Sequence, residues 1–161
     1  GVVSSPNLSV EQCYNLGEVS GAQNVAGIVG GSNRELKILN CYNTNKITGT
    51  RVAGIVYNYN NNDKMKIISC YNLGTLESST KYGITSAGVI ENSYYLSTCG
   101  ATDAHGESKS ESELKELASE LDKAFTIDDD NNTVTISTTD IQNIWENDTN
   151  KNNGYPIFAW Q

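Results

Sequence analysis

The sequence is poor in histidine, proline and phenylalanine, and it has no long apolar run. Because its one histidine is His105, a His-rich zinc site is excluded. No stretch of about 18 apolar residues is present, so we expect no membrane insertion. No secretory signal heads the chain; the sequence opens in the middle of its own pattern, and we expect it to be part of a longer protein.

Positive charge is also scarce. The 161 residues carry 11 Lys and Arg against 19 Asp and Glu, a formal net charge of −8. Residues 1–102 hold seven basic and six acidic residues, whereas residues 103–161 hold four and thirteen, so the acidity lies in the last third. An acidic chain repels phosphate backbones and anionic lipid, and we therefore expect no nucleic acid as a partner.

Asparagine, glycine, serine and threonine are abundant instead. The chain has twenty Asn, fourteen Gly and thirty Ser or Thr residues. Such polarity is typical of disordered chains, but it also suits a fold whose many turns place Asn and Gly at positive φ. The order of the residues along the chain decides between the two.

That order is periodic. Cys-Tyr-Asn recurs at residues 13–15, 41–43 and 70–72, at spacings of 28 and 29 residues, and a weaker copy, Ser-Tyr-Tyr, follows at 93–95. A branched apolar residue stands three positions before each Cys or Ser: Val10, Ile38, Ile67 and Ile90. Disordered sequence would not keep this register, so the repeat is a structural unit.

Each repeat contains short β-branched runs separated by Asn, Gly, Ser and Thr, which predicts short strands joined by turns. A unit of this length suits one coil of a solenoid, in which equivalent strands pair in parallel about 4.8 Å apart. We therefore predict a mainly β fold, with a parallel β-solenoid (β-helix) of about three to four coils over residues 1–102.

The repeat resembles the GLUG-motif repeats of bacterial cell-surface proteins. The resemblance lies in Cys-Tyr-Asn-Leu-Gly at 13–17 followed by Gly-Ile-Val-Gly at 27–30, a full copy of the naming motif. The second copy, at 54–57, loses its last Gly, and the third, at 83–86, keeps only its start. The ending from Asn152 through Trp160 is similar to the segment that closes such arrays, so the resemblance covers residues 10–97 and about 147–161.

The resemblance implies a secreted or wall-attached protein, most often from a gut or mucosal bacterium. In some relatives these repeats accompany immunoglobulin-A-cleaving metallopeptidases. The peptidase motif His-Glu-x-x-His is missing from this sequence, so that activity does not carry over.

The acidic last third has a different pattern. Residues 109–124 are predicted to form a helix, because Ser110 and Glu113 have the spacing of a capping box. Apolar residues at three- and four-residue steps give this helix one apolar face: Leu114, Leu117, Ala118, Leu121 and Phe125.

An acidic turn at 128–132 then separates two β-branched runs at 125–127 and 134–136, which predicts a hairpin. We expect a turn near 140–145 and a final strand near 155–160. Because an open solenoid end exposes unpaired strand edges, we interpret residues 103–161 as a C-terminal cap. In this interpretation the Leu stripe, Trp145 and Trp160 pack on the last coil.

The tyrosines of the repeat are a candidate binding surface, because aromatic rows on exposed sheets stack on sugar rings: Tyr14, Tyr42, Tyr71 and Tyr94. Each lies four residues after the branched apolar residue, and an even spacing in a strand places both on one face. That face is apolar in every copy, so we expect the tyrosines to point into the core. A bend at the residue before the Cys would overturn this expectation.

The cysteines form a second row. Adjacent strands bring Cys13, Cys41 and Cys70 within disulfide reach, but three in a row cannot all pair, and Ser93 takes the fourth place. We expect unpaired, buried thiols, with Cys99 a stray one. No Cys-x-x-Cys is present for structural zinc, and a Cys–His catalytic pair could use only His105, which lies in a polar segment.

Two charged groups are weaker candidates. Asp128–Asp130 could hold calcium, but the loop lacks the Gly and closing Glu of an EF-hand, so we expect a solvated turn. Lys37 and Lys66 align in the repeat, whereas Arg34 and Arg51 do not. Polysaccharide lyases on β-helices combine acids with Lys or Arg, but no acidic residue repeats beside these, and we expect a solvated face.

We therefore predict no catalytic residue, no cofactor and no metal site. The expected function is a non-catalytic structural or adhesion module of an extracellular or cell-surface bacterial protein. Its partner would be a host glycan or an extracellular protein, and the chain itself would be monomeric. The alternatives are a polysaccharide-binding or polysaccharide-processing β-helix module and an accessory module of a mucosal, immunoglobulin-A-type protease.

Overall fold

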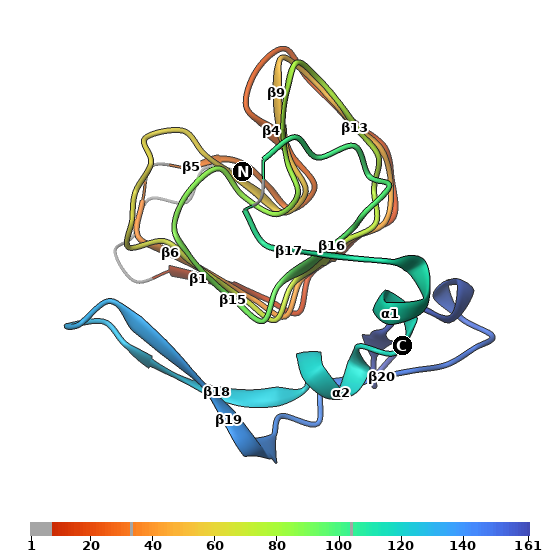
Figure 1. Cartoon of the computed structure of the whole chain (residues 1–161). Helices are drawn as coiled ribbons and strands as arrows, with labels where there is room; N and C mark the ends of the chain where they lie inside the picture. Colours follow the sequence, from red (N-terminus) through yellow and green to blue (C-terminus); the bar gives the residue numbers. More distant parts are fainter. Residues whose placement is uncertain (1–7, 33, 104) are drawn as a thin grey trace.

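The computed structural model describes residues 8–32, 34–103 and 105–161. In these residues the protein is mainly β, and the sheets of the repeat region are parallel. Figure 1 shows the chain returning to the same place after each repeat, so that equivalent strands lie side by side. We call residues 8–109 the repeat stack and residues 110–161 the C-terminal segment. None of the described helices is long and apolar enough to cross a membrane.

Two large parallel sheets form neighbouring sides of the stack. The first has the order β1-β6-β11-β15: β1 (Leu8–Glu11), β6 (Leu36–Leu39), β11 (Lys66–Ile68) and β15 (Val89–Glu91). The second has the order β17-β16-β12-β7-β2: β2 (Tyr14–Asn15), β7 (Tyr42–Asn43), β12 (Tyr71–Asn72), β16 (Tyr94–Leu96) and β17 (Glu107–Lys109).

Three smaller parallel sheets complete each repeat. One joins β3 (Val19–Ser20), β8 (Ile47–Thr48) and β13 (Leu76–Glu77). The next joins β4 (Val25–Ala26), β9 (Arg51–Ala53) and β14 (Thr80–Tyr82). The last pairs β5 (Val29–Ser32) with β10 (Val56–Asn58). The short strands follow from the short β-branched runs between Asn and Gly residues.

The strands pair in the register of the sequence repeat. Branched apolar residues are Cα partners from one repeat to the next: Val10, Ile38, Ile67 and Ile90. The tyrosines form a second such row: Tyr14, Tyr42, Tyr71 and Tyr94. The predicted parallel pairing of equivalent residues is therefore confirmed.

A left-handed backbone that recurs before each Cys or Ser of the repeat decides which side chains enter the core. The residue before each Cys or Ser has a φ of 48° at Gln12, 52° at Asn40, 53° at Ser69 and 50° at Asn92. This conformation turns the chain between two strands and breaks the alternation of side chains along it. The Cys therefore points into the stack, and the following Tyr points away from it.

The expectation that the tyrosines point into the core of the repeats was wrong for this reason. The core contains the branched apolar row and the thiols of Cys41 and Cys70. Tyr42, Tyr71 and Tyr94 are buried, but in a second cluster that they share with residues of the C-terminal segment. Because of the bend at the left-handed residue, the tyrosines lie on the outside of the stack, where the C-terminal segment covers three of them.

The asparagine of Cys-Tyr-Asn forms an amide ladder. The Asn15 Nδ2 donates to the Asn43 Oδ1 at 2.7 Å, and the Asn43 Nδ2 donates to the Asn72 Oδ1 at 2.8 Å. Asn43 and Asn72 are fully buried, so these hydrogen bonds replace water for groups that cannot reach it.

Gly27 and Gly54, the first residues of the Gly-Ile-Val copies in the first two repeats, pack against this ladder. A Cβ on Gly54 would lie 2.0 Å from the carbonyl oxygen of Gly83 and 2.6 Å from the Cβ of Asn72. A Cβ on Gly27 would meet Gly54 and Asn43 in the same way. The glycine recurs because the chain passes too close to its neighbours to leave room for a side chain.

The C-terminal segment has the predicted elements with shifted bounds. The predicted helix consists of two short ones, α1 (Glu111–Lys115) and α2 (Ala118–Leu121), and the Ser110–Glu113 capping box is confirmed. The hairpin is also confirmed, as β18 (Lys123–Asp128) and β19 (Thr133–Ile141), but Phe125 belongs to β18 and not to the helical stripe. The chain ends with β20 (Trp145–Glu146), η1 (Asn152–Gly154) and β21 (Ile157–Phe158), close to the predicted final strand.

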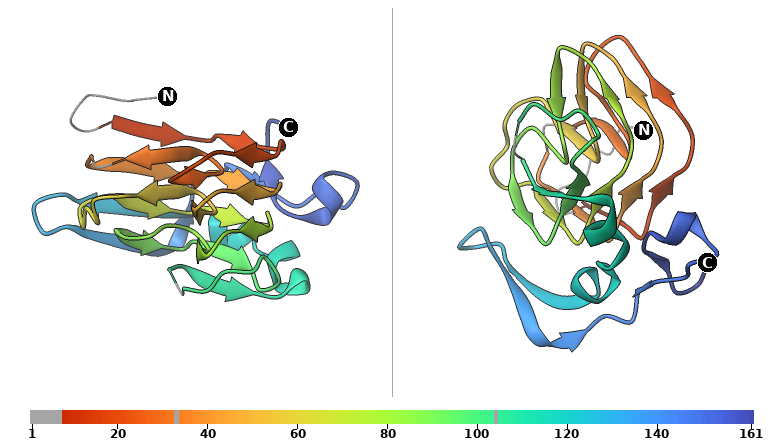
Figure 2. Two further views of the ribbon diagram at one scale, coloured as in Figure 1. Left: turned by 90° about the horizontal axis from the view of Figure 1, so that it is seen from above. Right: turned by 45° about the vertical axis from the view of Figure 1, so that its right-hand side comes forward.

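The segment lies along the side of the stack, and the expectation that Trp145 and Trp160 pack on the last coil was wrong. Figure 2 shows the C-terminus beside the first strands. The Trp160 Nε1 donates to the Gln12 Oε1 at 3.2 Å, and the Trp145 Nε1 donates to the Asn40 Oδ1 at 2.9 Å. By running back over the stack, the segment covers Tyr42, Tyr71 and Tyr94 and removes their rings from water.

The first residues of the predicted cap continue the stack. β17 pairs in parallel with β16, and the Ile84 N–H donates to the His105 carbonyl oxygen at 3.2 Å. Only after Lys109 does the chain leave the parallel sheets.

Candidate functional site

The tyrosine row is locked by stacking and by its cover. The rings of Tyr14 and Tyr42 stack at 5.2 Å between centroids with an interplanar angle of 10°, and those of Tyr42 and Tyr71 stack at 4.9 Å and 3°. The Tyr71 hydroxyl donates to the Pro156 carbonyl oxygen at 2.5 Å, and burial raises the pKa of Tyr71 well above its usual range. Burial also raises the pKa of Tyr94 to about 12, with nearby carboxylates acting in the same direction.

Only the first member of the row has a substantially exposed ring. Tyr14 is 39% exposed, whereas Tyr42 and Tyr71 are buried. Its neighbour from the C-terminal segment, Trp160, is 60% exposed, at 6.1 Å between ring centroids. Beneath both lies Phe158, which is fully buried. The outer aromatic row therefore ends in an exposed pair of rings.

The thiols are free, as predicted. Cys41 and Cys70 are fully buried, and their Sγ atoms donate to the carbonyl oxygens of Leu39 and Ile68 at 3.3 Å. A hydrogen bond with the Cys70 thiol, together with burial, raises the pKa of Cys41 far above its usual range. The thiol of Cys41 is therefore not activated as a nucleophile.

The environments of Cys13 and Cys99 differ from those that the sequence predicts. Cys13 is exposed and not buried, because its repeat is the first one among the described residues. Cys99 is not a stray thiol, since it belongs to the core cluster. The ring of His105 packs edge-on against Tyr82, at 5.5 Å between ring centroids.

The two aligned lysines are ion-paired to the hairpin. The Asp129 carboxylate lies 2.6 Å from the Lys37 Nζ and 3.1 Å from the Lys66 Nζ. The side chain of Lys66 is only 3% exposed, and its Nζ also donates to the Asn132 Oδ1 at 3.1 Å. Contacts with Lys37 and then Lys66 lower the pKa of Asp129. The expectation of a solvated lysine face was wrong, because Lys66 is covered by a turn 66 residues away along the chain.

The acidic turn at 128–132 also forms hydrogen bonds within itself, besides being exposed to solvent. The Asp128 carboxylate accepts hydrogen bonds from the backbone and the side-chain amide of Asn131, which shape the turn and lower the pKa of Asp128. Across the part of the chain that the structure describes, no three His, Cys, Asp or Glu side chains gather as metal ligands. Arg34 and Arg51 are exposed.

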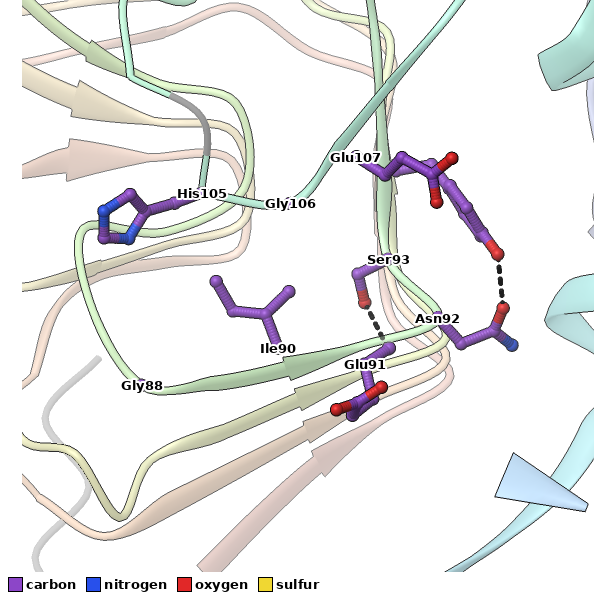
Figure 3. Close-up of a pocket in the computed structure, with 9 residues that line it drawn as sticks. Gly88, Ile90, Glu91, Asn92, Ser93, His105, Gly106 and Glu107 are labelled. Atoms are coloured by element: carbon purple, nitrogen blue, oxygen red, sulfur yellow. Dashed lines mark hydrogen bonds between the residues drawn. The ribbon is translucent and has the colours of Figure 1, made fainter. Parts of the chain in front are cut away.

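A pocket of about 470 Å³ opens at the last repeat, between β15 and residues 105–107 (Figure 3). Figure 3 shows Ile90 and Ser93 directed towards it, whereas the carboxylates of Glu91 and Glu107 point away from each other. The Ser93 hydroxyl donates to the Glu91 carbonyl oxygen at 3.0 Å. The lining groups therefore do not converge as an acid–base pair.

Sequence reasoning missed this pocket. It forms where residues 105–107 return beside residues 88–94, and no local motif marks that return. The one available signal is that the fourth repeat departs from the pattern, with Ser93 in place of Cys and Tyr95 in place of Asn. Loss of the repeating residues indicates that the regular stacking ends there.

Comparisons with known proteins give one structural relative. Neither a protein-family model nor a curated protein sequence matches the chain. The structure is similar to the crystal structure of a putative immunoglobulin A1 protease from Bacteroides ovatus, with a TM-score of 0.55 and 20% sequence identity. The match covers 95% of this chain and 58% of that one. At this identity the likeness shows a shared fold.

Proposed function

We propose that this chain is a non-catalytic structural and adhesion module of a secreted or wall-attached bacterial surface protein. In this proposal the repeat stack is a parallel β-solenoid of about three to four coils that presents a rigid surface outside the cell. The GLUG-type repeats, with Gly-Ile-Val-Gly at 27–30, support the extracellular and cell-surface assignment.

The observation that carries this proposal is the C-terminal segment, which fastens the repeats to one another. Its contacts reach Gln12 in the first repeat, Asn40 in the second, Lys66 in the third and Asn92 in the fourth. A solenoid gains stability from contacts between neighbouring repeats. Because the C-terminal segment contacts several repeats, we expect them to unfold together. Such a unit is suited to hold its shape while it displays a surface.

Several side chains that could carry chemistry support the same proposal, since they have structural partners. The buried thiols hydrogen-bond to carbonyl oxygens, the Tyr71 hydroxyl binds Pro156, and Lys66 is paired with Asp129. Groups engaged in this way are poorly placed to act as nucleophiles, acids or bases.

Equilibrium unfolding of the full chain in urea, together with an activity assay, tests the proposal. Both tryptophans lie in the C-terminal segment, so their fluorescence reports unfolding of that segment. Far-ultraviolet circular dichroism reports unfolding of the strands of the stack. We expect the two transitions to coincide, and we expect no cleavage of immunoglobulin A1 or of uronic-acid polymers. Separate transitions would contradict a rigid module, and cleavage by the purified chain would contradict a non-catalytic one.

A second candidate is an accessory module of a mucosal protease. It is favoured by the fold shared with the Bacteroides ovatus protein, of which the match covers 58%. As an accessory module the chain would bind immunoglobulin A1 without cleaving it. Binding of the purified chain to immobilised immunoglobulin A1, compared with immobilised immunoglobulin G, tests this candidate; equal or no binding would count against it.

A further inference from the structure

The exposed pair of Tyr14 and Trp160, which we call the aromatic platform, is held in a fixed geometry. The Trp160 ring stacks on Phe158 at 5.3 Å between centroids with an interplanar angle of 25°, and its Nε1 donates to the Gln12 Oε1. Tyr14 is stacked on Tyr42. The two exposed rings are thus supported from below, and little conformational freedom remains for a ligand to remove.

Tyr14 lies in the first described repeat, so within the described residues a ring of the row stacks on one of its faces and not on the other, whereas Trp160 lies outside the row. Buried aromatic rings in the second cluster contribute apolar area, whereas Trp160 leaves 60% of its surface in water although it stands beside Phe158, which is fully buried. Large aromatic rings held rigid and exposed, with an amide beside them, are the residue types that dominate binding energy at recognition sites.

The chemistry of the platform fits a sugar ring. The face of a pyranose carries several C–H groups with partial positive charge, and these pack favourably on the electron-rich face of an aromatic ring. The exposed amide of Gln12 adjoins the indole and places a polar group beside the apolar face. The centroids of the two rings lie 6.1 Å apart, with planes inclined by 43°, so that one ligand can contact both.

The charge around the platform selects among sugars. Glu11 and Glu18 are exposed and precede or follow the platform strand β2 closely in the chain, and the whole chain carries a net charge of −8. Sialic and uronic acids would meet this negative field, whereas neutral hexoses would not. We propose that the aromatic platform binds neutral pyranose residues of an oligosaccharide. The proposal deepens the adhesion function above and rests on it.

The experiment uses the two indole signals of the intact protein. The Trp145 Nε1–H is buried and bonded to Asn40, so it serves as an internal reference for the Trp160 Nε1–H. The chain is first applied to an array of immobilised neutral and sialylated oligosaccharides, and the strongest neutral ligand is then titrated in nuclear magnetic resonance. Lacto-N-neotetraose and 3′-sialyllactose serve as fixed probes. We expect the neutral ligand to shift the Trp160 signal and leave the Trp145 signal in place.

Substitutions locate the site. Trp160→Ala should weaken binding by about tenfold or more, and Gln12→Ala should weaken it less, because the indole then loses only its anchor. Tyr59→Ala is the matched control, since Tyr59 is 50% exposed and follows β10, outside the platform; it should leave binding unchanged. The melting temperature of Trp160→Ala should stay close to that of the parent chain, which separates loss of binding from loss of folding.

Several results would overturn the proposal. These are no neutral oligosaccharide that shifts the Trp160 signal, stronger binding of sialylated ligands, or full binding by Trp160→Ala. Broadening of the Trp160 signal with protein concentration alone would mean that a second copy of the chain occupies the platform. Each of these results leaves the coincident unfolding and the activity assay untouched, so failure here is distinguishable from failure of the structural proposal.

Discussion

The repeat stack and the C-terminal segment are held by opposite kinds of contact. In the stack each residue meets its own equivalent: tyrosine on tyrosine, asparagine on asparagine and isoleucine on isoleucine. In the C-terminal segment each contact occurs once, as between Trp145 and Asn40 or between Asp129 and Lys66. Repeating contacts therefore build the surface, whereas the non-repeating contacts determine which part of that surface stays exposed.

The strongest test of this comparison removes a ring that belongs to both regions. Tyr71 stacks within the row and donates to Pro156 in the C-terminal segment. Tyr71→Ala should lower the free energy of unfolding by about 3–5 kcal/mol, because it leaves a cavity under the segment. Tyr71→Phe keeps the ring and should cost only about 1 kcal/mol for the lost hydrogen bond. Urea unfolding of both variants checks this; equal losses would show that the ring itself contributes little.

A change inside the stack should have the next largest effect. Gly54→Ala places a Cβ 2.0 Å from the Gly83 carbonyl oxygen and should cost about 1–3 kcal/mol as neighbouring repeats move apart. The control is Gly30→Ala, whose Cβ would meet its nearest atom, in Asn24, at an ordinary 3.7 Å. Thermal unfolding should show a clear loss for the first variant and little change for the second. Tolerance of Gly54→Ala would mean that the repeats are more loosely packed.

A smaller effect is expected where the two regions meet through charge. The pKa of Asp129 is lowered in the folded state by Lys37 and Lys66, so its stabilising effect is present above its ordinary pKa of 3.8. That stabilisation disappears as the pH falls through the lowered folded value. Asp129→Asn should therefore be less stable than the parent chain at pH 7, and the difference should shrink towards pH 3.

The control for this charge test is Asp130→Asn, which changes an exposed neighbour in the same turn. It should leave the ion pairs of Asp129 with Lys37 and Lys66 in place, so the melting temperature at pH 7 should change little. A difference between Asp129→Asn and the parent chain that stayed constant from pH 7 to pH 3 would contradict the ion-pair account.

The smallest effect on stability is expected in the row of cysteines, in which Ser93 takes the fourth place. Cys70→Ser should cost less than about 1 kcal/mol, because the fourth repeat already has Ser93 there, with its hydroxyl bonded to the Glu91 carbonyl oxygen. The Cys70 Sγ makes the same contact with the Ile68 carbonyl oxygen. The reciprocal Ser93→Cys change should be tolerated equally. A large fall in the urea midpoint for either variant would show that the row discriminates between sulfur and oxygen.

The sequence predicts the pairing of the stack well because the repeat states it directly. Once Cys41 and Cys70 are aligned, every neighbour of the strand follows, and the positions of Ile38 and Ile67 confirm the register. The direction of the side chains could not be predicted from spacing alone. It depends on φ at Asn40 and Ser69, and the spacing of apolar residues does not give φ at a single position.

The candidate site was predictable only in its residue types. Tyrosine rows suggested a surface for sugars, but nothing in the sequence shows that Phe158 and Pro156 cover the middle of the row and leave Tyr14 exposed. The link between Lys66 and Asp129 was hidden for the same reason. Contacts between a repeating and a non-repeating region have no period, so only the folded chain reveals them.

The path of the C-terminal segment also sets an order on folding. The bond between Trp160 and Gln12 joins residues 148 positions apart, and closing so long a loop is slow compared with pairing neighbouring repeats. Because chains are made from the N-terminus, the rings of Tyr42 and Tyr71 remain uncovered until Trp145 and Phe158 have been made. A chain that ended before Ile157 would leave the rings of Tyr42 and Tyr71 exposed, and this apolar aromatic surface would be accessible to proteases and chaperones. The cover of the tyrosine rings therefore depends on synthesis having passed Phe158.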